Sequence, residues 1–252
     1  MVNYNLNDKV ALIAGATSGI GKVAAEMFAQ NGASVVLAGR RENLLKEITD
    51  KLIAQGYKAA YIACDVTDEQ QVKEMIAFTE KTYGRLDYSY NNAGIMPDDT
   101  LTAELSTSEF DRVINVNLRS MFLCMKYELQ QMLKQGGDGY SIVNCSSIGG
   151  IIGMPGRVAY HASKHAVLGM TKCAALEYAQ KGIRINAVCP ATIETPMVDA
   201  MVEKGAITNV IEPIGRFGKP EEVASMVLWL CTEDAGFVTG QSIAIDGGYT
   251  IK

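Results

Sequence analysis

Tyr160 and Lys164 stand four residues apart in the segment YHASK, and this spacing suggests acid–base chemistry. Residues i and i+4 share one face of a helix, so the ammonium group of Lys164 would lie beside the phenol of Tyr160. A free tyrosine has a pKa near ~10, and a neighbouring cation lowers it by stabilising the phenolate. The pair therefore predicts a general acid and base for neutral pH. Taken alone, the two residues would also fit a surface pair on an ordinary helix.

A glycine-rich segment, GATSGIG, covers residues 15–21 and follows the apolar run VALIA. Glycines let the backbone turn tightly and approach a pyrophosphate, whose charge is favoured at the N-terminus of the next helix. The spacing differs from the common GxGxxG and alone would fit a plain strand–helix turn, but its place between a strand and a helix favours a dinucleotide. The expected contacts are Gly15, Thr17, Ser18, Gly19, Ile20 and Gly21.

Short β-branched runs alternate with longer amphipathic segments, which predicts an α/β fold with a parallel sheet of about seven strands and helices on both faces. We expect strands at residues 10–14, 34–38, 58–63, 86–90, 141–145, 183–188 and 242–245. Helices are expected at residues 20–31, 42–55 and 68–83, the last with Asp68 as its N-cap. Right-handed crossovers favour the doubly wound, Rossmann-type arrangement. No repeat or linker divides residues 1–252, so we expect a single domain.

Two further loops follow expected strands, where ligands bind in sheets of this kind. Asp65 and its neighbour Val66 come after the third strand, and the Asp65 carboxylate is suited to accept a hydrogen bond from an adenine amino group. Asn92, Ala93 and Gly94 come after the fourth and offer exposed backbone to a cofactor ribose. Each segment alone is typical of a turn. Together they predict one cofactor crevice.

The composition indicates a soluble globular protein without a nucleic-acid or membrane partner. Hydrophobic residues make up 48% and charged residues 20% of 252, and the net charge is −5 without a clustered basic run. The N-terminal segment has neither the charged start of a signal peptide nor an apolar run that could span a bilayer. Scattered cysteines predict buried, reduced thiols and a cytoplasmic protein. They stand at positions 64, 124, 145, 173, 189 and 231.

The ordered set of motifs resembles the short-chain dehydrogenase/reductase family over residues 8–249. The matching segments are GATSGIG, CDV, NNAG, NVNL, the pair Ser146 and Ser147, YHASK, RINAVCPATIETPM and DGG. The resemblance implies an NAD(P)-dependent enzyme with a catalytic set of Asn117, Ser147, Tyr160 and Lys164. Lys164 would also hold the nicotinamide ribose, and Ser147 would hydrogen-bond the substrate oxygen. Asn117 would kink its helix and hold water in a proton relay to Lys164.

The resemblance also implies nicotinamide contacts from Pro190, from the backbone of Ile193 and from the side chain of Thr195. Two positions depart from the family pattern. Ala14 stands where a threonine usually precedes the first glycine, which puts local stability in doubt. Ala191 stands where a glycine usually follows the proline, which puts cofactor affinity in doubt.

The segment LAGRREN, residues 37–43, predicts NADP(H) as the cofactor and NAD(H) as the alternative. Folds that bind NAD usually end the second strand with an acidic residue, but Gly39 occupies that place here. Arg40 follows it, and a guanidinium matches the geometry of a 2′-phosphate. Arg41 either adds a second cation or begins the next helix facing solvent. Glu42 is the contrary feature, since it would reach the ribose of NAD.

We expect an oxidoreductase that interconverts a secondary alcohol and a ketone, and the resemblance implies hydride transfer from the B face of the nicotinamide. Residues 148–157 and 195–216 are expected to shape the pocket, and their apolar, Met-containing sequence suggests a largely apolar substrate. A 3-oxoacyl-thioester reductase of fatty acid synthesis would need a basic surface for an acidic carrier. A hydroxysteroid dehydrogenase is equally permitted. A non-catalytic nucleotide-binding protein should have lost Tyr160 or Lys164.

His161 and His165 are also four residues apart, a spacing that can bind zinc. They lie about 100° around the helix from Tyr160, and no cysteine or carboxylate motif accompanies them. We therefore interpret them as helix-surface or interface residues and expect no metal. The resemblance implies a homotetramer with the helix around Tyr160 packed between subunits.

Overall fold

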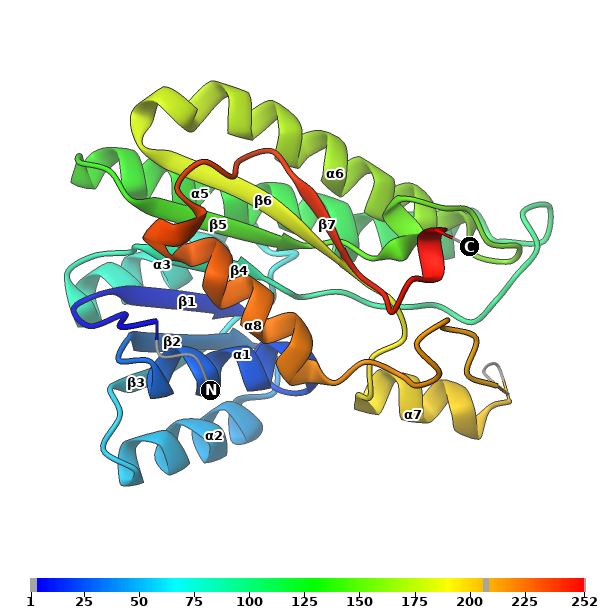
Figure 1. Cartoon of the computed structure of the whole chain (residues 1–252), viewed down its shortest axis with the longest axis horizontal. Helices are drawn as coiled ribbons and strands as arrows, with labels where there is room; N and C mark the ends of the chain where they lie inside the picture. The colour runs from blue at the N-terminus through cyan, green and yellow to red at the C-terminus, as the bar shows by residue number, and fades with distance from the viewer. Residues whose placement is uncertain (1–3, 206–208, 252) are drawn as a thin grey trace.

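A seven-stranded parallel sheet forms the centre of the computed structural model, which describes residues 4–205 and 209–251 (Figure 1). The strand order is β3-β2-β1-β4-β5-β6-β7, so the direction of winding reverses between β1 and β4. This is the predicted doubly wound, Rossmann-type sheet. The strands are β1 (Val10–Ala14), β2 (Ser34–Gly39), β3 (Ala59–Ala63), β4 (Tyr88–Asn91), β5 (Tyr140–Cys145), β6 (Ile183–Pro190) and β7 (Ser242–Ile245).

Helices cover both faces of the sheet (Figure 1). On one face α1 packs against α8, and on the other α3 packs against α5. The helices are α1 (Gly19–Gln30), α2 (Glu42–Ala54), α3 (Glu69–Tyr83), α4 (Thr107–Ile114), α5 (Ser120–Gln135), α6 (Val158–Tyr178), α7 (Pro196–Glu203) and α8 (Pro220–Cys231). Within the described residues, 4–205 and 209–251, no helix is long and apolar enough to cross a membrane.

Each face of the sheet has its own hydrophobic core because successive side chains of a strand point to opposite sides. Ile13 of β1 belongs to the core beneath α1 and α8, together with Phe28 and Val227. Its neighbour Leu12 belongs to the core beneath α3 and α5, together with Met75. Packing on both faces holds the strands in place, and the loops at the carboxyl ends of the strands are positioned by them.

The predicted elements match the structure closely, apart from their ends. Asp68 is the N-cap of α3 as predicted, and its Oδ1 accepts hydrogen bonds from the backbone of Gln70 and Gln71 at 2.8 and 3.1 Å. β4 begins two residues later than predicted, at Tyr88. The backbone of Leu86 is hydrogen-bonded instead to the side chain of Gln135, so the strand ladder begins after it.

The prediction that the cysteines are buried is wrong for one of the six. Cys64, Cys124, Cys145, Cys189 and Cys231 are buried, whereas Cys173 is exposed. Cys173 lies on the outward face of α6, as does Leu176, whose exposed fraction is 85%. The sequence around Cys173 is apolar enough to suggest burial, but α6 places Cys173 on the face that points away from the sheet.

Candidate functional site

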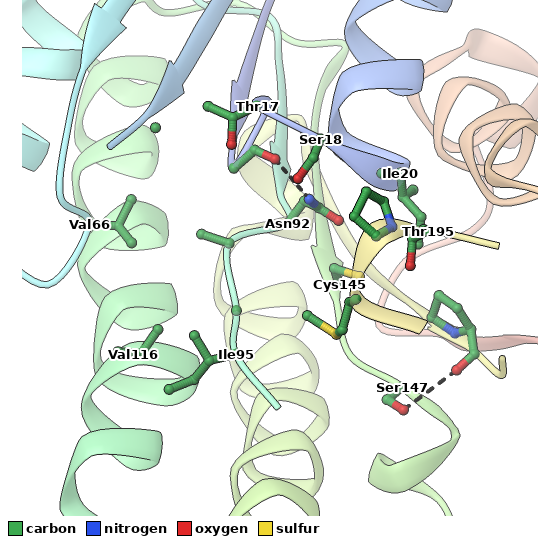
Figure 2. Close-up of a pocket in the computed structure, with 18 of the residues that line it drawn as sticks. Thr17, Ser18, Ile20, Val66, Asn92, Ile95, Val116, Cys145, Ser147 and Thr195 are labelled. Carbon is green, nitrogen blue, oxygen red and sulfur yellow. Dashed lines mark hydrogen bonds between the residues drawn. The ribbon is translucent and has the colours of Figure 1, made fainter. Parts of the chain in front are cut away.

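A cavity of about 580 Å³ opens where the carboxyl ends of the strands meet (Figure 2). Loops that follow β1, β2, β3, β4, β5 and β6 contribute to its wall. All the predicted site residues line this cavity except Gly21 and Asn117, which lie directly behind its wall. The sequence-based expectation of one crevice built from successive loops is therefore met by the geometry.

The glycine-rich loop after β1 lies tightly against the loop after β4. Gly15 has a φ of 85°, and a Cβ atom there would lie 2.7 Å from the backbone nitrogen of Ala93. The Asn92 side chain donates a hydrogen bond to the carbonyl oxygen of Gly15 at 3.1 Å (Figure 2). A Cβ atom at Gly21 would lie 2.3 Å from that same oxygen. Glycine at both positions thus leaves the N-terminus of α1 facing the cavity, which suits a pyrophosphate.

Arg40 and Arg41 both line the cavity, but their side chains differ in what they contact. The Arg41 guanidinium donates hydrogen bonds to the hydroxyl groups of Thr17 and Ser18 at 2.5 and 2.8 Å. Arg40 has no side-chain partner within the described ranges, so its guanidinium is available to a ligand. Glu42, the contrary feature of the sequence, is exposed in the first turn of α2 and does not line the cavity.

Tyr160 and Lys164 lie in the first half of α6 with the lysine side chain buried to an exposed fraction of 3%. The Lys164 Nζ donates a hydrogen bond to the carbonyl oxygen of Cys145 at 2.8 Å and lies 5.6 Å from the centre of the Tyr160 ring. The simple surface-pair alternative does not fit this burial. A buried ammonium and a phenol are thus brought together at the cavity wall.

Asn117 lies in a π-helical turn, Asn115–Arg119, between α4 and α5. Its amide is fully buried, accepts a hydrogen bond from the backbone nitrogen of Ile95 at 2.8 Å and donates one to the Ile95 carbonyl at 2.9 Å. The expected interruption of the helix is present, since such turns widen a helix locally. A Cβ atom at Gly94 would lie 3.4 Å from Asn117 Oδ1 and 3.6 Å from Lys164 Nζ. Glycine therefore keeps the space between these two polar groups open.

Ser147 stands at the end of β5, just before a 3₁₀ turn at Ile148–Gly150. Its hydroxyl accepts a hydrogen bond from the backbone of Gly149 at 3.0 Å and reaches the Pro190 carbonyl oxygen at 3.5 Å (Figure 2). Ser146 is turned differently, and its hydroxyl donates to the backbone oxygen of Lys164 at 2.9 Å. Both serines line the cavity, and the Ser146 hydroxyl also ties α6 to the sheet.

Comparison with known proteins agrees with this architecture. The family model described as enoyl-(acyl carrier protein) reductase matches residues 15–250. The chain is 44% identical over 252 residues to a cyclohexanol dehydrogenase of Acinetobacter sp., covering 100% of this chain and 99% of that protein. It is 46% identical over 251 residues to a 3-oxoacyl-(acyl-carrier-protein) reductase of Thermotoga maritima, covering 98% and 99%. The chain belongs to the short-chain dehydrogenase/reductase family.

A solved structure of an actinorhodin polyketide ketoreductase with NADPH superposes with a TM-score of 0.89 at 37% identity, covering 96% of this chain and 97% of the other. The protein is therefore an oxidoreductase of this family, with the Rossmann-type sheet that the motif order predicted.

His161 is not the helix-surface residue that the sequence suggested as one alternative. Its exposed fraction is 7%, and its ring Nδ1 lies 2.8 Å from the carbonyl oxygen of Ile152. Burial lowers the pKa of His161. The loop after β5 folds over the start of α6 and covers this position, which helical spacing alone does not reveal. His165 is exposed, and in the described ranges no cluster of three or more His, Cys, Asp or Glu side chains is arranged to hold a metal.

Of the two positions that depart from the family pattern, one lies in a strand and the other directly follows a strand. Ala14 is buried at the end of β1 between Ala38 and Asn91 of the neighbouring strands. Ala191 follows β6, and its backbone donates a hydrogen bond to the Ile245 carbonyl at 3.1 Å, which anchors the loop after β6 to β7. Ala191 lines the cavity, whereas Ala14 does not.

Several residues that line the cavity were not assigned from the sequence. Ile95 directly follows the NNAG segment, Val116 precedes Asn117, and Cys145 precedes the serine pair (Figure 2). The strand-end rule would have found Ile95 and Cys145, which lie at or near the ends of β4 and β5. Val116 lies in the π-helical turn, and only its place next to Asn117 points to it. Met197 and Val198 of α7 add apolar surface from the segment expected to shape the pocket. Part of that segment, residues 206–208, lies outside the described residues.

Proposed function

We propose that the enzyme interconverts a secondary alcohol and a ketone by hydride transfer with NADP(H). The buried ammonium of Lys164 beside the Tyr160 phenol, at a cavity with a glycine-rich loop, is the observation that carries this proposal. The similarity to a cyclohexanol dehydrogenase and to a ketoreductase that binds NADPH supports it.

The nicotinamide ring supplies or accepts the hydride when the cofactor is bound. In reduction the Tyr160 hydroxyl gives its proton to the carbonyl oxygen of the substrate, and in oxidation the phenolate takes a proton from the alcohol. Lys164 stabilises the phenolate through its charge. Ser147 donates a hydrogen bond to the substrate oxygen and so stabilises the charge that develops there. Asn117 holds the Ile95 backbone and the water that links Lys164 to solvent.

The cavity residues divide among the parts of the cofactor. The glycine-rich loop and the N-terminus of α1 hold the pyrophosphate, Asp65 and Val66 hold the adenine, and the Asn92–Gly94 turn holds the ribose. Pro190, Ile193 and Thr195 meet the carboxamide. Arg40 pairs with the 2′-phosphate because its guanidinium lies free at the cavity, while Arg41 also lines the cavity and holds the glycine-rich loop through Thr17 and Ser18.

A carrier-bound 3-oxoacyl thioester is the second candidate substrate, favoured by the 46% identity to a reductase of that type. The charge of the segment between the cavity-lining residues Ile95 and Val116 argues against it. Residues 97–112 carry five acidic side chains and one arginine: Asp98, Asp99, Glu104, Glu109, Asp111 and Arg112. Asp98 forms an ion pair with Lys204, at the end of α7, at 2.6 Å. The charge of Lys204 is therefore already paired with a carboxylate of this chain. An acidic carrier protein would be repelled by this surface.

A panel of ketones with NADPH tests both candidates. We expect cyclic and other apolar free ketones to be reduced, with the loss of absorbance at the NADPH band as the readout. Carrier-bound 3-oxoacyl thioesters should be reduced more slowly than the free ketones. A clear preference for the carrier thioester would support the second candidate, and no turnover with any carbonyl compound would contradict the proposal.

We also propose that the protein is a cytoplasmic homotetramer in which α6 packs between subunits. Exposed apolar side chains on the outer faces of α5 and α6 support this assembly: Phe122, Leu133 and Leu176 have exposed fractions of 49%, 41% and 85%. Apolar groups gathered on outward helix faces are a common mark of a protein interface.

A further inference from the structure

A cluster of polar side chains is buried between the sheet and α5, away from the cavity wall. Glu128 of α5 is fully buried, and the Asn91 side chain of β4 donates a hydrogen bond to its Oε2 at 2.9 Å. Asn91 also donates to Oδ1 of Asn144, its partner on β5, at 3.1 Å. Ser89, two residues before Asn91, is buried on the same face of β4. None of these four side chains has a role in the proposed chemistry.

If Glu128 is ionised, the cluster is one hydrogen-bond donor short. Three of its atoms have no hydrogen-bond partner among the described residues: Glu128 Oε1, Asn91 Oδ1 and Ser89 Oγ. An ionised carboxylate and an amide oxygen can only accept hydrogen bonds, and a serine hydroxyl has a single proton to give. A protonated Glu128 supplies a second donor. Because a buried polar atom without a partner destabilises the fold, the protonated form is favoured.

The surroundings of Glu128 contain no cation to hold a carboxylate. No ion pair of the described residues includes it, and α3, which packs against α5, contributes the buried Met75 to the apolar core on this face of the sheet. The nearby titratable group on α5 is the Cys124 thiol, whose pKa is raised by burial and then by the Glu128 charge. On α6 the facing group is the neutral Thr171 hydroxyl, which accepts from Asn144, while the Lys164 ammonium bonds the Cys145 carbonyl. Burial raises the pKa of Glu128 to about 7, against the opposing effects of the Asn91 and Ser89 side chains, which lower it.

The cluster is joined to the candidate active site at two adjacent residues. Asn91 is followed by Asn92, whose side chain holds the Gly15 carbonyl of the glycine-rich loop. Asn144 is followed by Cys145, whose carbonyl oxygen accepts the hydrogen bond from Lys164. The two asparagines therefore fix the ends of β4 and β5 where those strands meet the cavity.

We propose that Glu128 is a positioning residue whose protonated carboxyl group holds the ends of β4 and β5, and through them Lys164 and the glycine-rich loop. The positioning part rests on the proposed function, whereas the protonation part does not. Loss of the proton at higher pH leaves a buried charge without a cation in the cluster. The junction of β4, β5 and α5 then loosens, and the alignment of the active site weakens with it.

The protonation is tested by infrared spectroscopy of the whole protein without any substrate. At pH 6 the wild type should show a carboxylic-acid C=O band that is missing from Glu128→Gln and that fades as the pH is raised through about 7. Glu222→Gln is the matched control, because the Glu222 carboxyl is paired with Arg216, which lowers its pKa to about 2. The same band should persist in that control. Identical spectra for the wild type and Glu128→Gln at pH 6 would overturn the inference.

The positioning is tested by kinetics of two variants. Glu128→Leu should lower kcat by about tenfold and weaken NADPH binding, because small displacements at an active site cost rate, while KM for the ketone changes little. Glu128→Gln has nearly the same shape and carries an amide N–H donor at every pH. Its kcat should therefore match that of the wild type at low pH, and it should not lose activity above neutral pH. A Glu128→Leu enzyme with wild-type kcat would overturn the positioning role. If no ketone is reduced by the wild type, the proposed function fails, and the infrared spectra and NADPH affinity still decide this inference.

Discussion

At the scale of single residues, the two tasks that we propose for Lys164 can be separated by a variant. Its ammonium lies beside the Tyr160 ring and also at the cavity wall. Lys164→Met should weaken NADPH binding and shift the pH dependence of alcohol oxidation upward, because the phenolate loses its neighbouring cation. The measurement is the pH–rate profile of the residual activity. An unchanged profile would leave Lys164 with cofactor binding alone.

Arg40 should decide the choice between the two cofactors. We expect kcat/KM to favour NADPH over NADH at least tenfold, about 1.4 kcal/mol, because a free guanidinium at the end of β2 matches a 2′-phosphate. Arg40→Asp should erase or invert this preference and spare the activity with NADH. Arg41→Ala is the informative comparison, since Arg41 bonds Thr17 and Ser18 and its loss should impair both cofactors. Equal use of both cofactors by the wild type would contradict this assignment.

The residues of the cavity were largely predictable because each belongs to a motif at a strand end. The side chains that were misjudged depend on what covers them. His161 is buried by the loop after β5, and Cys173 is exposed by the orientation of α6. Neither fact is encoded in the local periodicity of the helix. The sequence left two roles open for Arg41, as a second cation or as a solvent-facing residue at the start of the helix. Its contact with Thr17 and Ser18 joins two loops that are distant in sequence, so it could not be predicted locally.

At the scale of elements, the junction of β4, β5 and α5 should make stability depend on pH. The pKa of Glu128 is raised in the folded protein from 4.5 to about 7, so the folded state binds more protons than the unfolded state between these values. The free energy of unfolding should therefore fall as the pH rises through this range and then level off. The contribution lost is about 3 kcal/mol.

Urea unfolding of the wild type and Glu128→Gln at pH 5 and pH 8 measures this effect. The difference in unfolding free energy between the two pH values should be smaller for the variant, which has no proton to lose at this position. Other carboxyl groups titrate equally in both proteins and cancel in the comparison. An equal pH dependence in both proteins would show that Glu128 titrates at an ordinary pKa.

The elements themselves were predictable from alternation and capping, but their ends were not. Asp68 caps α3 through its own side chain, a local interaction that the sequence shows. The start of β4 is instead set by Gln135, 49 residues away, whose side chain takes the backbone hydrogen bonds of Leu86. The cluster around Glu128 is likewise invisible in sequence, because Glu128 looks like one more polar residue on an amphipathic helix.

At the scale of the whole molecule, the outer faces of α5 and α6 predict self-association. Light scattering after gel filtration should give the mass of a tetramer of the 27.2 kDa chain. Leu176→Asp places a charge on the exposed apolar surface of α6 and should shift the mass towards smaller species, since a buried unpaired charge weakens an interface. The exposed Ile53→Asp on α2 is the matched control and should leave the mass unchanged. A monomeric wild type would contradict the proposed assembly.

The central claim is that Tyr160 exchanges the proton during hydride transfer in this cavity. Tyr160→Phe removes one oxygen and keeps the ring, so NADPH should still bind while ketone reduction falls by at least about 100-fold. Tyr178→Phe on the same helix lies outside the cavity and serves as the control with unchanged rate. The decisive measurement is the rate of NADPH consumption by the three proteins with a ketone that the wild type reduces. A Tyr160→Phe enzyme that keeps more than about a tenth of the wild-type rate would contradict the account.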